Sequence, residues 1–172
     1  MHIHFGQTFN GNRSLTLPDS LGQQVLGPAG LLNLLETHLG LLVLLPTQSE
    51  RIVQFRNVLN VCKEHTFYHK SFELDELGTA RTLLQWRDTW YLHGWQGNFD
   101  PGVSEQLATM AEVEASAVTT VAGCEGQRLQ AVLQMLEGGS IVPIRQISLY
   151  DEMESFPLAW RRVLERLPCK IV

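Results

Sequence analysis

The sequence predicts a helix-rich α/β domain, in which a small sheet has helices on its flanks. Strand-like stretches lie near both ends of the chain, at residues 2–5, 23–26 and 141–150. Between them, apolar residues recur at intervals of three and four over several segments, as in helices that bury one side. The 172 residues, of which 44% are hydrophobic, suffice for one domain with a sizeable core.

The N-terminal strand is predicted from alternation. Ile3 and Phe5 fall on one side of it and His2 and His4 on the other, so one face should be buried. Residues 10–20 are rich in turn-forming residues, and we expect a hairpin or loop there.

Two helices in the first half carry clear signals at their ends. Pro28 at the first helical position and Gly40 just past the last one frame a helix of about a dozen residues. The apolar run of residues 41–45 follows as a buried strand or an extended link. Thr47 and Glu50 then have the spacing of a capping box, which predicts the start of a second helix.

The central helix is predicted over residues 76–93, with Asp75 as its N-cap and Gly94 just after its end. Trp86 and Trp90 lie at i, i+4 in this helix. It is apolar on most sides, so we expect several other elements to pack against it.

Two polar groups near this helix are assigned structural roles. Arg87 and Asp88 are interpreted as a partly exposed polar face rather than a catalytic pair. Residues 65–72 are interpreted as an aromatic packing segment with exposed imidazoles.

The second half is predicted to contain three more helices. Residues 115–126, which are small and polar, are the best candidate for an exposed linker. Pro143 confines the strand of residues 141–150 to an edge or to a strand start. The predicted helices run from Ser104 to Val113, over residues 127–136 with Gly138 and Gly139 behind it, and from Pro157 to Leu167.

Composition favours an intracellular, cytoplasmic protein. Its three cysteines, Cys62, Cys124 and Cys169, are far apart and have no metal-ligand spacing. The net charge of −5 argues against a broad face for nucleic acid. The most apolar stretch, residues 31–45, is interrupted by polar side chains, so no membrane span is expected. Charged residues make up only 18%, which suggests that another chain or further sequence covers part of the surface.

The strand, glycine and helix around Gly27 are arranged as at a nucleotide-binding loop, but the residues that bind phosphate and magnesium in such a loop are missing. A Walker A loop ends in glycine, lysine and serine or threonine, which hold the phosphates and the magnesium ion. Counting from Gly27 and Pro28, those three positions are Leu32, Asn33 and Leu34. The sequence therefore predicts a degenerate phosphate loop without ATP or another cofactor.

Two further groups of polar residues could carry a function. An alternative to a non-catalytic domain is a small metal- or ligand-binding αβ protein, which would need histidines to converge in a pocket. Because no third-ligand pattern accompanies the two-histidine spacings, no metal is predicted. The second group is a basic strip on the last helix, which is interpreted as a solvated face and, if DNA is touched at all, as the contact. The histidines are His2, His4, His38, His65, His69 and His93, and the strip is Arg161, Arg162 and Arg166.

Several blocks together resemble the N-terminal region of bacterial PD-(D/E)XK nuclease-family proteins related to AddB and RecB. The blocks are LGPAGLLNLLETHLGL, FELDELGTARTLLQWRDTWYLHGW, LATMAEVE and PIRQISLYDEMESFPLAWRRVLERL. The resemblance implies a longer parent, in which a helicase-like half with an often decayed ATPase site precedes a C-terminal exonuclease domain that processes DNA ends. The nuclease carboxylates and lysine would lie beyond Val172, so no catalytic residue is carried over to this chain.

The expected function is therefore that of a scaffold or interaction domain in a DNA-repair helicase–nuclease. Residues 1–172 would form a single helicase-like domain without catalytic residues of its own. The resemblance implies that its partners are the remainder of the parent chain and an AddA-like helicase subunit, with DNA bound through the parent and no membrane.

Overall fold

A computed structural model of the chain describes residues 1–9, 22–41, 46–64, 66–100 and 102–172. The chain divides into two compact units rather than the single domain that was predicted. Unit 1 comprises Met1–Val43 and Arg128–Val172, and unit 2 comprises Leu44–Gln127. Unit 2 is thus inserted into unit 1. The predictions for residues 10–20 and 41–45 concern segments that lie wholly or almost wholly outside the described residues.

The sheet of unit 1 is parallel throughout. Its described strands are β1 (His2–Phe5), β2 (Gln23–Leu26), β3 (Gln146–Leu149) and β4 (Lys170–Ile171), in the order β2-β1-β3-β4. In this register Phe5 lies between Leu26 and Leu149, so the carboxyl ends of the first three strands meet at one edge. The strand predicted over residues 141–150 forms only at 146–149, after Pro143, which has no N–H to donate.

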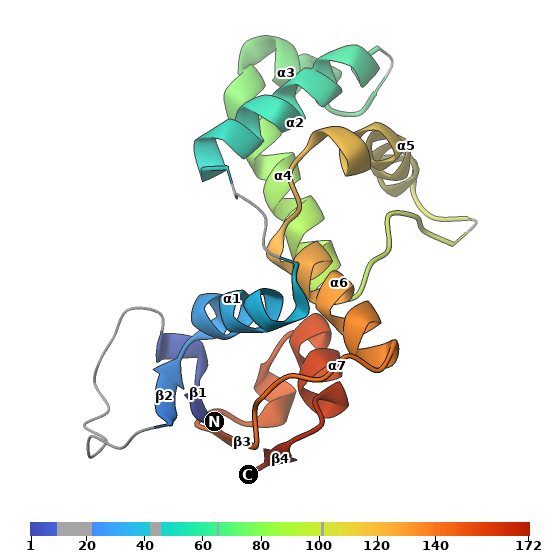
Figure 1. Ribbon diagram of the computed structural model, residues 1–172. Coiled ribbons are helices and arrows are strands. Elements are labelled where there is room, and N and C mark those ends of the chain that lie inside the picture. The colour runs from blue at the N-terminus through green and yellow to red at the C-terminus, as the bar shows by residue number, and fades with distance from the viewer. Residues whose placement is uncertain (10–21, 42–45, 65, 101) are drawn as a thin grey trace. The chain divides into compact units, whose positions relative to one another are not determined.

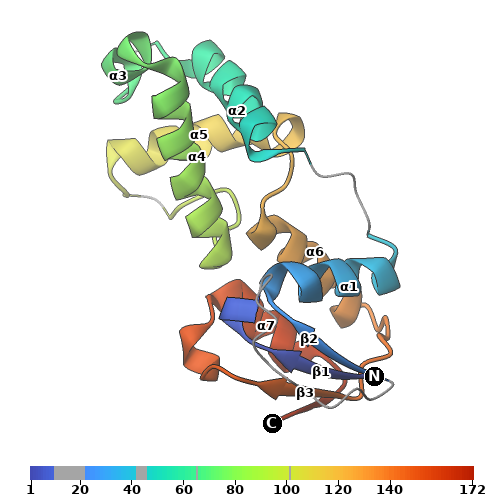
Figure 2. The same cartoon turned by 90° about the vertical axis from the view of Figure 1, so that its left-hand side faces the viewer.

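Helix α7 (Leu158–Arg166) covers the sheet face that carries Ile3 and Phe5, as both views show (Figures 1 and 2). The Phe5 ring stacks on Phe156 at 5.1 Å and meets Trp160 at 5.2 Å between centroids. This is the face that alternation predicted to be buried. The opposite face departs from the prediction, because His4 there is only 8% exposed. Short 3-10 turns, η1 (Gln7–Phe9) and η2 (Met153–Ser155), follow β1 and β3.

Helix α1 (Pro28–Leu39) has the predicted ends. Pro28 stands at its start, and Gly40 after it has the left-handed φ of 70° that favours glycine. Its buried Glu36 accepts two hydrogen bonds from Arg128 of α6 (Glu125–Glu137), at 2.7 and 2.6 Å. This pair fixes α1 beside the part of α6 that belongs to unit 1.

Unit 2 is built from helices alone in its described residues. They are α2 (Gln48–Cys62), α3 (His69–Leu74), α4 (Glu76–Leu92), α5 (Glu105–Thr120) and the first residues of α6. Their apolar sides enclose one core, which includes Phe55, Leu59, Tyr68, Phe72, Leu84, Met110 and Val113. Tyr68 and Phe72 confirm that the segment before α4 is an aromatic packing segment.

The end signals of α4 are confirmed, and its buried side is a stripe beside Trp86 and Trp90. The Asp75 carboxylate accepts the N–H of Gly78 at 2.8 Å, and Gly94 has a φ of 92°. This buried stripe is Ala80, Leu83, Leu84, Arg87 and Tyr91. Trp86 is 44% exposed, because it lies beside this stripe and not on it.

The linker predicted over residues 115–126 is wrong. Helix α5 continues to Thr120, and α6 begins at Glu125. Ala117 is fully buried in the core of unit 2, and Cys124 is also buried. Two of the small residues that suggested a linker, Ala117 and Gly126, are instead packed against neighbouring elements.

Replacing Thr47 by alanine is expected to lower the free energy of unfolding by about 1 kcal/mol. The Thr47 hydroxyl accepts the N–H of Glu50 at 3.2 Å, and the Glu50 carboxylate accepts the N–H of Thr47 at 2.7 Å, which confirms the capping box. The N–H and the hydroxyl of Thr47 both donate to the Glu50 carboxylate, at 2.7 and 2.9 Å, and thereby hold the pKa of Glu50 below its usual value. Thermal unfolding followed by circular dichroism measures the loss. Thr82→Ala is the control, since that exposed hydroxyl bonds only to the Gly78 carbonyl within the helix. An equal effect of both substitutions would contradict the role of the cap.

Candidate functional site

The predicted phosphate-loop position is a tight strand-to-helix junction. Gly27 alone joins β2 to α1, in an extended conformation, and its carbonyl already accepts the N–H of Leu31 at 2.9 Å. Pro28 offers no N–H, and Leu31 and Leu32 are buried in the core of unit 1. A phosphate cradle needs a run of free backbone amides. This junction has no such run, because the helix begins at once.

The remaining positions of that motif have structural roles. The Asn33 side-chain oxygen accepts a hydrogen bond from Arg128 at 2.9 Å, and Leu34 is half-buried. In addition, β2 is an edge strand in the described sheet, whereas doubly wound sheets bind ligands where the strand order reverses. The interpretation of Gly27 to Leu34 as a decayed helicase loop therefore stays a prediction.

The reversal of strand order lies between β1 and β3, and the chain itself fills it. The N–H of Gln7, after β1, donates to the carboxylate of Asp151, after β3, at 2.7 Å. A side chain on Gly6 would come within 3.0 Å of the Phe9 ring and 3.2 Å of Asp151, which explains the glycine. An internal carboxylate thus occupies the place where such sheets bind an anionic ligand. Sequence reasoning missed this contact, since only the strand order reveals it.

The histidines do not converge in the described part of the chain. His2 and His4 lie side by side on β1 with ring centroids 4.4 Å apart, and hydrogen-bond to Ser148 and Tyr150 at 2.9 and 3.1 Å. Burial and the neighbouring His4 lower the pKa of His2. His38 is on α1, His69 on α3 and His93 after α4, while His65 lies outside the described residues. Among the described residues, no group of three His, Cys, Asp or Glu side chains is placed to hold a metal ion.

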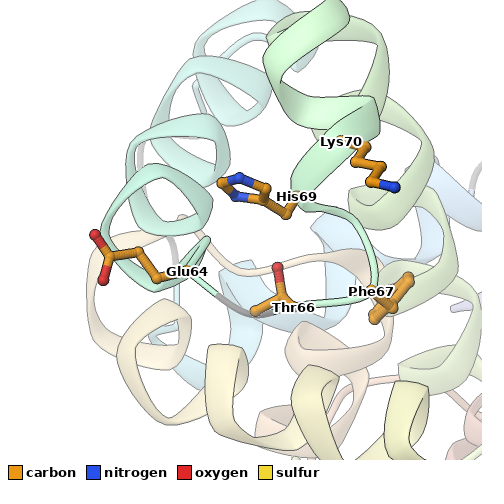
Figure 3. A pocket seen from close by; sticks show the side chains of 5 residues that line it. All are labelled: Glu64, Thr66, Phe67, His69 and Lys70. Carbon is orange, nitrogen blue, oxygen red and sulfur yellow. The ribbon is translucent and has the colours of Figure 1, made fainter.

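In the hollow drawn in Figure 3, beside the start of α3, the side chains are also not arranged as in a catalytic or ligand-binding site. His69 lines it, but its two ring nitrogens already face the Lys63 carbonyl at 3.1 Å and the Glu73 carboxylate at 3.4 Å. The Thr66 hydroxyl donates to the same carbonyl. Glu64 and Lys70 point away from each other. His69 and Thr66 are thus held by local contacts, and the side chains that line the hollow do not point toward a common centre.

Unit 2 contains a buried ionic network around Arg87, which was predicted to form a partly exposed polar face with Asp88. Arg87 is 0% exposed, and its guanidinium forms a bidentate pair with Glu114 of α5, with Nη2 at 2.8 Å from Oε1. The hydroxyl of Tyr91 donates to the same carboxylate at 2.8 Å. Asp88 links this pair to a second one: its Oδ1 lies 3.7 Å from Arg87 Nη1, and both of its oxygens accept hydrogen bonds from Arg51, at 2.7 and 2.8 Å. Arg87 and Asp88 thus belong to one network with Glu114 and Arg51, and they do not form an exposed polar face.

The network is structural, and one of its nitrogens, Arg87 Nη1, is buried without a hydrogen-bond partner and faces Asp88 at 3.7 Å. Burial alone would lower the pKa of Arg87, but the hydrogen bonds and charge of Glu114 outweigh it and raise the pKa. The pKa of Tyr91 is raised by burial and by the same carboxylate. Burial also raises the pKa of the neighbouring Cys124 thiol to about 11, so this cysteine is not a nucleophile at neutral pH.

Only part of the basic strip predicted on α7 is exposed to solvent. Arg162 and Arg166 are exposed, whereas Arg161 is half-buried and its Nε is buried without a hydrogen-bond partner.

No helix in the described ranges has the length and apolarity of a membrane span. Comparison of the sequence with protein-family models and with curated proteins finds no match.

Proposed function

We propose that this chain is a non-catalytic interaction module of a longer cytoplasmic DNA-repair helicase–nuclease. The observation that carries the proposal is the junction at Gly27, where buried leucines and an immediate helix start take the space of a phosphate loop. The sequence blocks that resemble AddB- and RecB-related proteins support a helicase–nuclease as the longer parent protein. Nucleotide chemistry would then be left to an AddA-like partner subunit and DNA cleavage to the C-terminal part of the parent.

Two further observations support a role in assembly. The strand-order reversal holds Asp151 of the chain itself, so the second place where such a sheet could take a nucleotide is also occupied. Unit 2 also carries exposed apolar side chains, and two of them, Leu74 and Trp86, line one hollow together with Phe67 and Leu83. Exposed apolar side chains that gather in a patch are typical of surfaces that other chains cover.

A nucleotide titration tests the proposal. The chain should give no saturable change in fluorescence with a fluorescent ATP analogue and Mg²⁺ up to millimolar concentration, because Gly27 leads directly into α1 and Pro28 at its first position offers no N–H to a phosphate. Saturable binding in the micromolar range, or ATP hydrolysis, would overturn it. In the parent protein, deletion of residues 1–172 should abolish co-elution with the helicase subunit. Unchanged co-elution would equally count against the proposal.

A further inference from the structure

The hollow lined by Leu74 and Trp86 is an open groove between α3 and the first three turns of α4, and we name it the α4 groove. Tyr68 and Leu83 also line it and are each only 2% exposed, so its floor is the surface of the unit 2 core. Leu74 is 89% exposed and Trp86 44%, so both stand on its rim. The groove has a volume of about 540 Å³, within the range of sites that bind ligands.

The α4 groove is long, and an apolar strip continues beyond it. Asp75 and Trp86 both line the groove and are eleven residues apart, which corresponds to about 16 Å along a helix. Past Trp86, the ring of Trp90 follows at 6.3 Å between centroids, and the ring of Phe99 lies 5.4 Å from that of Trp90. Trp90 and Phe99 are both half-buried. A small molecule would fill only part of such a strip, whereas a helix of about four turns would cover about 22 Å of it.

The charge at the α4 groove is negative. Asp75 is the only charged residue among those that line it. One oxygen of its carboxylate accepts the N–H of Gly78, and Asp75 forms no ion pair within the described part of the chain. Glu73, which is exposed on the other side of Leu74 in sequence, has only the His69 ring nearby, at 3.4 Å. The exposed Leu74 is therefore flanked by two carboxylates.

The whole net charge of the chain resides on unit 2. This unit contains eleven acidic and six basic residues, a net charge of −5, whereas unit 1 contains seven of each. Three of the six cations, Arg51, Arg56 and Arg87, are already paired with carboxylates. Opposite charges favour association, and like charges placed face to face oppose it. A basic partner therefore fits unit 2, whereas nucleic acid or a second copy of unit 2 would be repelled.

We infer that the α4 groove binds a basic amphipathic helix of a partner protein, an inference that rests on the proposed function. Apolar side chains at i, i+4 and i+7 of that helix would lie over Leu83, between Leu74 and Trp86, as in other complexes in which a helix fills a groove. Its lysine or arginine side chains would face Asp75 and Glu73. An extended peptide fits less well, because the described residues of unit 2 contain no strand whose edge it could pair with.

The test is fluorescence anisotropy of the labelled model peptide LKKLLKLLKKLLKL with the full chain, in about 100 mM salt, where charges more than about 10 Å apart are screened. Leu74→Glu/Trp86→Glu should weaken binding at least tenfold, because it removes two apolar anchors. The control is Leu77→Glu/Val61→Glu, at positions that are 51% and 82% exposed and do not line the groove. Each variant changes the net charge by −2, from −5 to −7, so attraction by charge cannot explain a difference. The control should stay within about threefold of the original chain.

The role of charge is tested separately. Asp75→Asn removes the carboxylate but keeps a good N-cap for α4, and should weaken binding of the lysine peptide about twofold to fivefold. Glu112→Gln, at an exposed position of α5 outside the groove, is the control and should leave binding unchanged. The peptide LEELLELLEELLEL should bind at least tenfold more weakly than its lysine counterpart. Circular dichroism checks that each variant is folded and should show a gain of helix when the lysine peptide binds.

Four results would contradict the inference: no saturation with the lysine peptide, equal losses in the groove and control variants, equal affinity for the two peptides, or a dimer in sedimentation that Leu74→Glu/Trp86→Glu dissociates. The last result would make a second copy of the chain the occupant. The outcome is separable from that of the proposed function. Absent peptide binding removes the basic helix and leaves the nucleotide and co-elution results standing, whereas saturable ATP binding overturns the proposed function even if the peptide binds.

Discussion

Replacing Glu114 by alanine is expected to lower the free energy of unfolding of unit 2 by about 3–5 kcal/mol. Arg87 is fully buried, so the substitution removes the counter-ion that is hydrogen-bonded to it and leaves only Asp88, at 3.7 Å, near its charge. Tyr91 loses the acceptor of its hydroxyl at the same time. Domains are typically stable by about 5–15 kcal/mol, so this loss takes a large share of the total.

Urea denaturation followed by tryptophan fluorescence measures the effect, since Trp86, Trp90 and Trp95 all lie in unit 2. Glu112→Ala, at an exposed position of the same helix, is the matched control and should change stability by at most about 0.5 kcal/mol. The double variant Arg87→Met/Glu114→Leu should lose less than Glu114→Ala alone, because it removes both buried charges. Equal stability of Glu114→Ala and Glu112→Ala would show that the ion pair is not buried as described.

The features predicted correctly from sequence are those with a local cause. The helix-end signals act within one turn of the helix that they begin or end, so a few neighbouring residues suffice to predict them. They are Thr47 with Glu50, Asp75, and Gly40. The alternation of Ile3 and Phe5 is likewise local, and it identified the face that α7 covers. The helix-rich α/β class follows from such signals.

The features that failed depend on residues far apart in the chain. Arg87 lies on the buried stripe of α4, four residues from both Leu83 and Tyr91, and this position was the available signal for its burial. Its partner Glu114 is 27 residues away and is brought to it only by the packing of α5. The carboxylate at the strand-order reversal is also invisible locally, because Gln7 and Asp151 are 144 residues apart. Periodicity alone likewise cannot show that residues 44–127 form an insertion.

Gly126→Ala should be the second strongly destabilising substitution, with a loss of about 3 kcal/mol. A β-carbon at this position would lie 2.6 Å from the Leu92 nitrogen and 2.7 Å from the Tyr91 β-carbon, and closer still to the Tyr91 carbonyl carbon. These are mostly backbone atoms of α4, which cannot turn away as a flexible side chain can. The start of α6 and the end of α4 must therefore separate.

This expectation has the opposite sign from the ordinary effect of alanine in a helix. Glycine to alanine in a helix interior normally stabilises by about 1 kcal/mol, because glycine loses more backbone entropy on folding. Gly123→Ala is the matched control, since its nearest neighbour would be 3.9 Å from the new β-carbon. That substitution should be neutral or should stabilise by about 0.4–1 kcal/mol. Urea denaturation of both variants decides: if Gly126→Ala also stabilises, the first turn of α6 does not pack against the α4 backbone, and the enclosure of Glu114 and Arg87 beside it is wrong as well.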